Sequence, residues 1–406
     1  MSLPSVLLST VSCILILMSL AVALYYLLLA LVGITLRPRG RISSCELSEA
    51  TNSFCILIPA HNEERTITPT LAACDNLDYP RHKIMICVVA DNCTDKTAEM
   101  VREKGFLCLE RHDPFHKGKG HALAWALPKI LPAKPDAVVV LDADCTIDRQ
   151  ALRVFDRLLN RGCSAIQAAY VAGNPEASPI AFALALGNFI ENFLFYSPKS
   201  SLGLSVFLRG TGMVFSRKIL ERFIWTAASL TEDTEYGLML LSAGMHIHFT
   251  AEAQVHSDFP QTNDQLSAQR ERWNRGNISL ARKQAFRLIW LGCRTRRLAL
   301  VDAGWSLLIL SRPIIALHLA LALLMAALCT ASYPSYSTRL LLLAGIASVC
   351  VHFTVLVMAV FLFGLNSRRM KLLVKFPLVF AALCANALNA FLARGPASWQ
   401  KTPRRS

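Results

Sequence analysis

The feature that most constrains this chain is a long apolar stretch near its beginning. Residues 7–36 contain no charged side chain, and a helix needs only about 20 apolar residues to cross a bilayer. A cleaved signal peptide is the alternative, but no basic residue precedes the stretch and no clean small-residue cleavage site follows it. Residues 1–41 are therefore predicted to form an N-terminal transmembrane helix with a basic flank. That flank, Arg37, Arg39 and Arg41, favours a cytoplasmic location for the residues that follow.

Two apolar segments near the other end of the chain predict further spans. Residues 307–329 and 340–365 are each long enough to cross a bilayer, and a polar turn joins them. Arg312 lies inside the first segment, where an arginine must reach toward the interface or face protein and water. We expect residues 301–366 to hold both spans.

The last apolar segment, residues 376–392, is ambiguous. A fourth span would carry the basic tail across the membrane, against the positive-inside bias, and Asn386 and Asn389 weaken the segment as a lipid-facing helix. We expect residues 367–406 to form an interfacial or re-entrant helix and a basic cytoplasmic tail. The chain is then an integral, multi-pass membrane protein with a cytoplasmic middle region, in the inner membrane if the source is bacterial.

The charge of the chain indicates a membrane surface as its partner, not nucleic acid. The formal net charge is +14, but the basic residues flank apolar segments and no nucleic-acid recognition motif accompanies them. Residues 277–300 combine basic side chains with large apolar ones at helical spacing, which predicts a basic amphipathic segment at the membrane interface. The 13 cysteines include no C-x-x-C pair, so we expect reduced thiols and neither a disulfide framework nor a cysteine metal site.

Residues 52–276 carry the pattern of a soluble α/β domain. Short apolar runs alternate with helical patterns, which is typical of βαβ units and a largely parallel sheet. The runs predict strands at residues 54–59, 84–90, 106–110, 137–141 and 165–172, and helices at 67–76, 149–160, 180–196 and 231–243 with two more ending near 104 and 127.

Two aspartates mark the end of the fourth predicted strand. Residues 138–141 are apolar without alternation, as in a strand buried on both faces of a sheet, and Asp142 and Asp144 follow. Ligands of open α/β sheets gather at the carboxyl ends of the strands, where two carboxylates can hold a hard divalent cation that also grips a diphosphate. The alternative for an isolated D-x-D is an Asp-rich turn with a helix cap.

Polar residues follow the neighbouring strands at the same edge. His61, Asn62 and Glu63 come after the first strand, and Asp91 ends the second. The lysine- and glycine-rich loop around Lys117 opens a helix and can hold phosphate oxygens through charge and backbone donors. Its spacing is not that of a P-loop, and a flexible turn is the alternative.

A glycine turn and an acidic helix start complete the set. Gly210 and Thr211 lie in a turn where a backbone can approach a ligand closely. Glu232 and Asp233 belong to a group of three carboxylates in the first turn of a predicted helix, more than helix capping requires. Mutual repulsion near a diphosphate would raise the basicity of one of them, which suits a general base.

In their order and approximate spacing, these motifs resemble membrane-embedded family 2 glycosyltransferases, the group that contains cellulose, chitin-oligosaccharide and hyaluronan synthases. The resemblance covers residues 52–276 closely and the membrane layout loosely. It is carried by residues 59–64, Asp91, the Lys117 loop, residues 142–144, residues 231–233 and the Q-x-x-R-W motif at residues 269–273.

The resemblance implies an α/β GT-A (Rossmann-like) catalytic domain with transmembrane helices at both ends. It also implies an inverting, metal-dependent hexosyltransferase that uses a nucleotide sugar, expected to be a UDP-sugar, and forms a β-glycosidic bond. Asp142 and Asp144 would hold Mg or Mn, and Asp233 with Glu232 would supply the base. His61, Asn62, Glu63 and Asp91 would hold the nucleoside, and Lys117 would approach the phosphates. In the Q-x-x-R-W motif, Arg272 would meet the diphosphate, Trp273 would stack on the acceptor sugar, and Gln269 would be a further substrate-binding residue.

Three functions stay open at this point. The first is transfer to a polysaccharide or oligosaccharide acceptor at the membrane. The second is transfer of a single sugar to a membrane lipid, which the small number of predicted spans after the domain keeps open because a polysaccharide synthase needs helices to line a pore. The third is a non-catalytic component that binds nucleotide sugar or glycan.

Overall fold

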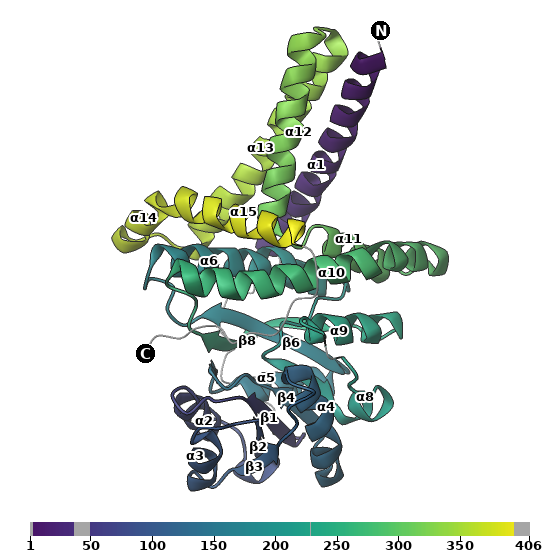
Figure 1. The fold of residues 1–406 in the computed structure, drawn as a ribbon. Helices are drawn as coiled ribbons and strands as arrows, with labels where there is room; N and C mark the ends of the chain where they lie inside the picture. Colours follow the sequence, from purple (N-terminus) through teal and green to yellow (C-terminus); the bar gives the residue numbers. More distant parts are fainter. Residues whose placement is uncertain (1–2, 36–48, 228, 394–406) are drawn as a thin grey trace.

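The computed structural model describes residues 3–35, 49–227 and 229–393. A globular base holds the sheet, and a stalk of long helices rises from it, with a layer of helices running across the foot of the stalk (Figure 1). The basic flank at Arg37, Arg39 and Arg41 and the basic tail from residue 394 onward lie outside the described residues.

One mixed sheet of eight strands forms the centre of the base in the described part of the chain. Its strands are β1 (Phe54–Ala60), β2 (Ile84–Asp91), β3 (Leu107–Arg111), β4 (Ala137–Val140), β5 (Cys145–Ile147), β6 (Ala165–Ala172), β7 (Met213–Ser216) and β8 (His248–Ser257). They lie in the order β3-β2-β1-β4-β7-β6-β8-β5. Strands β1 to β4 pair in parallel, so their carboxyl ends meet at one edge.

The five predicted strands are confirmed, each to within one residue at either end. The expectation of a largely parallel sheet is only half right, because β7 runs antiparallel to β4 and β6, and β5 runs antiparallel to β8. Strands β5, β7 and β8 were not predicted. β5 and β7 are three and four residues long, and β8 mixes polar and apolar side chains, so their pairing depends on distant partners that a local pattern does not reveal.

Helices cover both faces of the sheet. Along β1, Cys55 and Leu57 belong to one core and Ile56 and Ile58 to the other, as alternation in a strand requires. The first core contains α4 (Lys119–Ile130), α8 (Arg217–Arg222) and α9 (Glu232–Ser242), and the second contains α2 (Ile67–Asp75), α3 (Thr97–Glu103) and α5 (Ala151–Asn160), with short 3-10 turns at η2 (Arg81–Lys83) and η3 (Leu131–Ala133).

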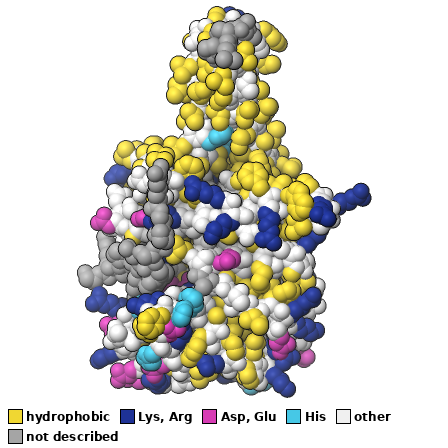
Figure 2. Space-filling view, turned by 45° about the vertical axis from the view of Figure 1, so that its right-hand side comes forward, with side chains coloured by type: hydrophobic (Ala, Val, Ile, Leu, Met, Phe, Trp, Pro, Cys, Tyr) yellow, Lys and Arg dark blue, Asp and Glu magenta, His cyan; other side chains and the backbone are white. Residues whose placement is uncertain are grey.

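The stalk consists of α1 (Leu3–Thr35), α12 (Arg312–Ser332) and α13 (Tyr336–Phe363), which lie side by side (Figure 1). Apolar side chains cover its surface, and Lys and Arg side chains gather where it meets the base (Figure 2). Each of the three helices is long and apolar enough to cross a membrane. The first of the two C-terminal spans begins at Arg312 and not at residue 307, because the chain breaks after α11 (Leu298–Leu308).

A layer of helices separates the stalk from the sheet (Figure 1). Residues 179–201 also pass the length and hydropathy test for a span, but 72% of the tested window is buried inside the protein, as expected for a helix packed within the domain. The segment of residues 367–392 forms two helices bent by 50°, a broken span or a re-entrant loop by composition, and the second runs across the foot of the stalk. The layer comprises α6 (Pro179–Glu191), its continuation through the π-helical η4 (Asn192–Tyr196) and α7 (Ser197–Ser201), α10 (Asn263–Thr295), α11, α14 (Ser367–Val374) and α15 (Phe376–Leu392).

A buried ion pair within this layer is hydrogen-bonded to the stalk. The Lys199 ammonium of α7 lies 2.7 Å from a carboxylate oxygen of Asp302 in α11, and both side chains are almost fully buried. The Tyr25 hydroxyl of α1 donates to the other oxygen of Asp302 at 2.6 Å. Since a buried charge is stable only when it is paired and hydrogen-bonded, these contacts fix the foot of the stalk against the base.

Candidate functional site

A cleft of about 750 Å³ opens at the carboxyl ends of β1, β2 and β4. It brings together most of the residues that the sequence indicated, although they come from strand ends, the Lys117 loop and α10. Those lining the cleft are His61, Glu63, Asp91, Lys117, Asp142, Asp144, Gln269, Arg272 and Trp273.

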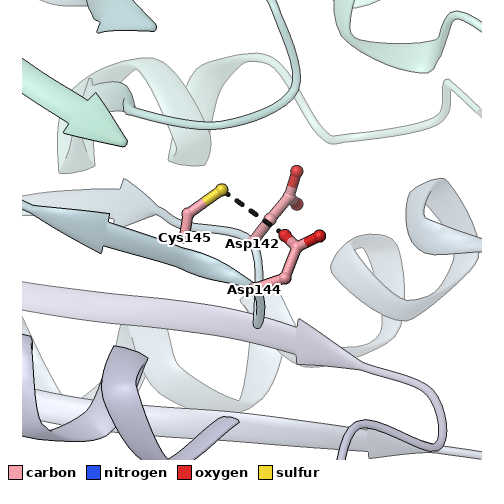
Figure 3. Close-up of side chains that lie close together, drawn as sticks. All are labelled: Asp142, Asp144 and Cys145. Atoms are coloured by element: carbon pink, nitrogen blue, oxygen red, sulfur yellow. Dashed lines mark hydrogen bonds between the residues drawn. The ribbon is translucent and has the colours of Figure 1, made fainter. Parts of the chain in front are cut away.

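The two aspartates lie at the centre of this cleft. Asp142 and Asp144 follow β4 directly, and one oxygen of each lies within 4.8 Å of the other and of the Cys145 sulfur (Figure 3). The backbone N–H of Asp142 donates to the Thr211 hydroxyl at 3.1 Å, which fixes the start of the turn. Carboxylate oxygens are the ligands that Mg²⁺ and Mn²⁺ prefer, so this donor pair fits such an ion, whereas the buried Cys145 is not a ligand of the preferred type.

Lys119, two residues after the predicted Lys117, is a cation that contacts Asp142. The Lys119 ammonium forms an ion pair with Asp142 and donates to the Gly210 carbonyl at 2.7 Å. Burial by itself lowers the pKa of Lys119, but Asp142, Glu232 and Asp233 together raise it above its usual value. Lys117 is exposed at the mouth of the cleft. The sequence places both lysines in the same loop. Only the structure shows that the Lys119 side chain contacts Asp142 while the Lys117 side chain is exposed.

The base of the cleft near β2 is held by an ion pair. The Arg111 guanidinium lies 2.6 Å from Asp91, both side chains are buried, and the same guanidinium donates to the His116 carbonyl at 2.8 Å. Nδ1 of His61 lies 2.7 Å from the Asp91 carbonyl oxygen. Arg111 was not indicated by the sequence, because nothing local marks the last residue of β3 as the partner of Asp91.

Asn62 and Thr211 do not line the cleft, and they shape the loops around it. Asn62 has a φ of 55°, and its Oδ1 accepts from the Thr94 N–H at 2.8 Å, which links the loops after β1 and β2. Thr211 is buried, and its carbonyl accepts from the Gln167 side chain at 2.9 Å.

A second cavity of about 550 Å³ adjoins the first. The two share Lys117, Lys119, Asp142, Gln269, Arg272 and Trp273 as lining residues. Glu232, Asp233 and Gly210 line only the second cavity. A Cβ built on Gly210, whose φ is +80°, would lie 3.5 Å from both an Asp233 oxygen and the Lys119 nitrogen. Lys119 and Gly210 therefore lie between the Asp142 carboxylate and the Asp233 carboxylate.

The first turn of α9 places Glu232 and Asp233 together in this cavity. Burial, together with the neighbouring Asp233, raises the pKa of Glu232 to about 7, and burial also raises the pKa of Asp233. The Thr234 N–H donates to Asp233 at 2.7 Å, which fixes one carboxylate oxygen. Carboxylates of raised pKa in a cavity are suited to proton transfer near neutral pH.

The far side of the second cavity is apolar and belongs to the membrane-proximal helices. It reaches between α6, the start of α12, α13 and α15. Its apolar lining there includes Leu184, Leu186, Ile190, Leu356, Phe376, Phe380 and Leu383. The polar end with Asp233 and the apolar end thus belong to one continuous space.

Comparison with known proteins agrees with this geometry. The family model described as "Glycosyltransferase like family 2" matches residues 51–276, which is more than half of the chain.

Curated relatives are similar over the same region. The probable glycosyltransferase YdaM of Bacillus subtilis is 28% identical over 59% of this chain and 58% of its own length. A beta-monoglucosyldiacylglycerol synthase of Nostoc is 27% identical over 59% of this chain and 52% of its length. A poly-beta-1,6-N-acetyl-D-glucosamine synthase of Staphylococcus epidermidis is 25% identical over 62% of this chain and 60% of its length. The chain thus matches little more than half of each relative.

Among solved structures, the mannosyltransferase PcManGT from Pyrobaculum calidifontis, in complex with GDP-Man and Mn²⁺, has a similar fold. The TM-score is 0.59 at 19% identity, with 95% of this chain and 99% of that chain covered. The predicted α/β GT-A fold with apolar helices toward both ends of the chain is confirmed.

Proposed function

The chain belongs to glycosyltransferase family 2, and from this we propose that it transfers a single sugar from a UDP-sugar to a membrane lipid, with formation of a β-glycosidic bond. As a member of that family it is an enzyme that uses a nucleotide sugar. The proposed acceptor is supported by the geometry of the second cavity. A non-catalytic component is not proposed, since the acidic residues of every motif are present.

The observation that carries the lipid acceptor is the shape of the second cavity. It begins at Asp233 and ends among Phe376, Phe380 and Leu383 of α15, next to the helices that are long enough to cross a membrane. An apolar chain can enter from the membrane side while its polar head reaches the carboxylates. A polysaccharide has no long apolar chain that would extend to the apolar end of this space.

Asp233 is the proposed general base. It takes the proton from the acceptor hydroxyl while the hydroxyl oxygen attacks the anomeric carbon. The bond between that carbon and the diphosphate oxygen breaks on the opposite side, so the configuration inverts and the nucleoside diphosphate leaves with the electron pair. Glu232 lies beside Asp233, and repulsion between the two carboxylates together with burial raises their affinity for a proton, so the deprotonated form is a stronger base.

Cations on the other side are proposed to stabilise the leaving group. Asp142 and Asp144 would hold Mg or Mn, which when bound supplies positive charge to the diphosphate. Arg272 and Lys117 line the same cleft and add charge from the protein itself. Lys119 lies between Asp142 and Gly210 and orients the Asp142 carboxylate.

The remaining residues of the cleft are assigned to the nucleoside and the acceptor. His61, Glu63 and Asp91 would bind the nucleoside. Asn62 would support this binding by holding the loops after β1 and β2 together. The backbone at Gly210 would approach the transferred sugar, with Thr211 supporting the turn. Gln269 and Trp273 line both cavities and would contact the acceptor side.

We also propose how the chain lies at the membrane. Residues 52–276 form the cytoplasmic catalytic domain, residues 1–41 and 301–366 hold the spans, and residues 367–406 stay at the cytoplasmic interface. Residues 277–300 contact membrane lipids through exposed side chains such as Arg282, Arg287, Phe286 and Trp290. The boundary at residue 276 falls inside α10, so the catalytic domain and this segment share one helix.

One observation favours an oligosaccharide or polysaccharide acceptor as the second candidate. The Trp273 ring lines both cavities, and aromatic rings supply flat apolar surface on which sugar rings pack. This candidate requires a product that grows by repeated addition.

The experiment that separates the two incubates the purified full chain with Mn²⁺, a panel of radiolabelled UDP-sugars and a total membrane lipid extract. We expect label in an organic-extractable lipid that carries one sugar. A water-soluble polymer, with no labelled lipid, would contradict the lipid acceptor.

A pair of variants on α15 tests the cavity itself. Leu383→Trp fills the apolar end and should raise the KM for the lipid while leaving the KM for the UDP-sugar unchanged. Leu378→Trp is the matched control, because Leu378 is 75% exposed on the same helix and lines neither cavity.

A further inference from the structure

Three arginines from three different elements converge on the membrane-proximal part of the second cavity. Arg209 precedes the Gly210 turn, Arg270 lies on α10, and Arg312 begins α12. Glu191 of α6 is the carboxylate that lies near them, 3.5 Å from Arg209 and 3.6 Å from Arg312. Arg270 also interacts electrostatically with Glu191, and Arg209 with Asp233, so three guanidinium groups lie near two carboxylates in this cavity.

These guanidinium groups are incompletely hydrogen-bonded. Within the described parts of the chain, the buried Nε of Arg270 and the buried Nε of Arg312 have no hydrogen-bond partner, and the buried Nη1 of Arg209 has only the ion pair with Glu191 at 3.5 Å. Leaving a buried donor without a partner costs about 1–3 kcal/mol, and more when the group is charged. Two unpartnered donors and one long ion pair around one cavity indicate a ligand that accepts hydrogen bonds and carries negative charge.

The surroundings hold the guanidinium planes in place. Arg209 lies over the rings of Tyr170 and Tyr196, Arg270 lies 5.1 Å from the ring centroid of Trp273, and Arg312 donates to the Gly187 carbonyl at 2.9 Å. Burial lowers the pKa of Arg270 to about 10, so it is still charged at neutral pH. A preorganised set of planar, fixed cations is the arrangement that recognises phosphate oxygens.

The donor diphosphate is not the anion that fits here. The first cleft, where Asp142 and Asp144 lie, is not lined by Arg209, Arg270 or Arg312. These arginines line the cavity that continues to Phe376 and Phe380. An anion bound to them would lie between the catalytic carboxylate and the apolar end, where the headgroup of a lipid has to sit.

We propose that the lipid acceptor carries a phosphate in its headgroup and that Arg209, Arg270 and Arg312 bind this phosphate. The inference rests on the proposed lipid acceptor and narrows it to phosphate-bearing lipids. The phosphate is bound and not transferred, so the bonds that form and break are those of the sugar transfer described above.

The test measures binding to the full chain in detergent, without a donor, by isothermal titration. The probes are dioctanoyl phosphatidic acid, dioctanoylglycerol with the same chains and no phosphate, and inorganic phosphate. We expect the phosphatidic acid to bind at least about tenfold more tightly than the diacylglycerol, and inorganic phosphate to bind weakly because it lacks the chains.

Variants on two separate helices assign the effect to the cluster. Arg270→Gln and Arg312→Gln should each reduce the preference for phosphatidic acid severalfold while leaving UDP binding with Mn²⁺ unchanged, which also reports that the variant is folded. Arg161→Gln, an exposed position that lines neither cavity, is the control and should keep the preference.

The outcomes separate the two proposals. Equal binding of the two lipids by the wild-type chain would overturn phosphate recognition and leave the lipid acceptor standing. Binding of neither lipid would overturn both. Binding of inorganic phosphate as tightly as phosphatidic acid would also overturn the proposal, because the site would then take a soluble anion.

Discussion

At the scale of single residues, one lysine lies between two carboxylates with different proposed roles, cation binding and proton acceptance. Asp142 is held by Lys119, and Lys119 also contacts Gly210, on whose other side lies Asp233. One lysine thus lies between the carboxylate proposed to bind the cation and the carboxylate proposed to accept a proton. A neighbouring cation favours the ionised form of a carboxylate. Substitutions at Asp142 or Asp144 and at Asp233 should therefore affect cation binding and proton acceptance separately.

Asp233→Asn should abolish transfer and spare donor binding. The amide cannot accept the proton, and loss of general base catalysis lowers kcat by about 10²–10⁴-fold. Turnover and UDP affinity measured on the same preparation check this. Glu235→Gln is the control, because Glu235 lies in the same first turn but lines neither cavity, and wild-type turnover by Asp233→Asn would remove the residue from the base role.

Asp144→Ala should weaken the metal-dependent part of donor binding. Removing one of two carboxylates leaves a poorer set of hard ligands for Mg or Mn. UDP titrations with and without Mn²⁺ should show a smaller difference than in the wild type. Asp75→Ala, which breaks an ion pair with Arg81 at an exposed surface, should leave the difference unchanged. An undiminished effect of Mn²⁺ in Asp144→Ala would argue against the assignment.

The pH dependence of transfer follows from the same carboxylates. Burial and Asp233 raise the pKa of Glu232 to about 7, and burial raises the pKa of Asp233. A raised pKa keeps a carboxyl protonated to higher pH, and a protonated carboxyl cannot act as a base. We therefore expect kcat to fall as the pH decreases into the range where these carboxyl groups take up protons, which for Glu232 lies at about 7. A rate that stays constant between about pH 5 and pH 8 would contradict a base with raised pKa.

At the scale of elements, α10 is the helix that links donor cleft, acceptor cavity and membrane surface. Its first half carries Gln269, Arg272 and Trp273 into both cavities, and its second half exposes Phe286 and Trp290. The same helix packs closely against the start of α9. Movement of α10 relative to the base would therefore displace the catalytic carboxylates as well as the acceptor side of the cleft.

Gly276→Ala tests that packing. An alanine Cβ would lie 2.6 Å from Cγ2 of Thr231, the residue before α9, so one of the helices must shift. In an exposed helix the change would stabilise by about 1 kcal/mol, but overpacking costs about 1–3 kcal/mol. We expect a lower thermal midpoint and a lower kcat. Ser279→Ala, at an exposed position of the same helix, should show neither effect, and an unchanged midpoint for Gly276→Ala would show that the contact relaxes freely.

At the scale of the whole molecule, an apolar stalk stands on a charged base, with a layer of crossing helices between them (Figures 1 and 2). Three stalk helices crossing the membrane would place the two ends of the chain on opposite sides. The basic side chains at the junction and the bent pair α14–α15 match a protein that rests on an anionic cytoplasmic surface.

Tags at the two ends test this arrangement. In sealed cells, external protease should remove a tag placed before Met1 and should not reach one placed after Ser406. Permeabilised cells are the control, in which both tags should be cleaved. External cleavage of the C-terminal tag would instead indicate that residues 367–392 form a fourth span.

The sequence by itself determined whatever depends on local pattern. Runs of apolar residues located β1 to β4 and β6 and the stalk helices, since a buried strand and a membrane helix each need a particular length of apolar side chains. The ordered motifs indicated the family. The position of Asp142 and Asp144 after a predicted strand indicated a ligand site, because the carboxyl ends of parallel strands meet at one edge of the sheet.

Tertiary structure decided what depends on distant partners. The pairing of Asp91 with Arg111, the contact of Lys119 with Asp142, and strands β7 and β8 all need elements far apart in the sequence. The cluster of Arg209, Arg270 and Arg312 exists only because a turn and two helices meet at one cavity. Local sequence sets the properties of each segment, but the direction and burial of a side chain are set by what packs against it.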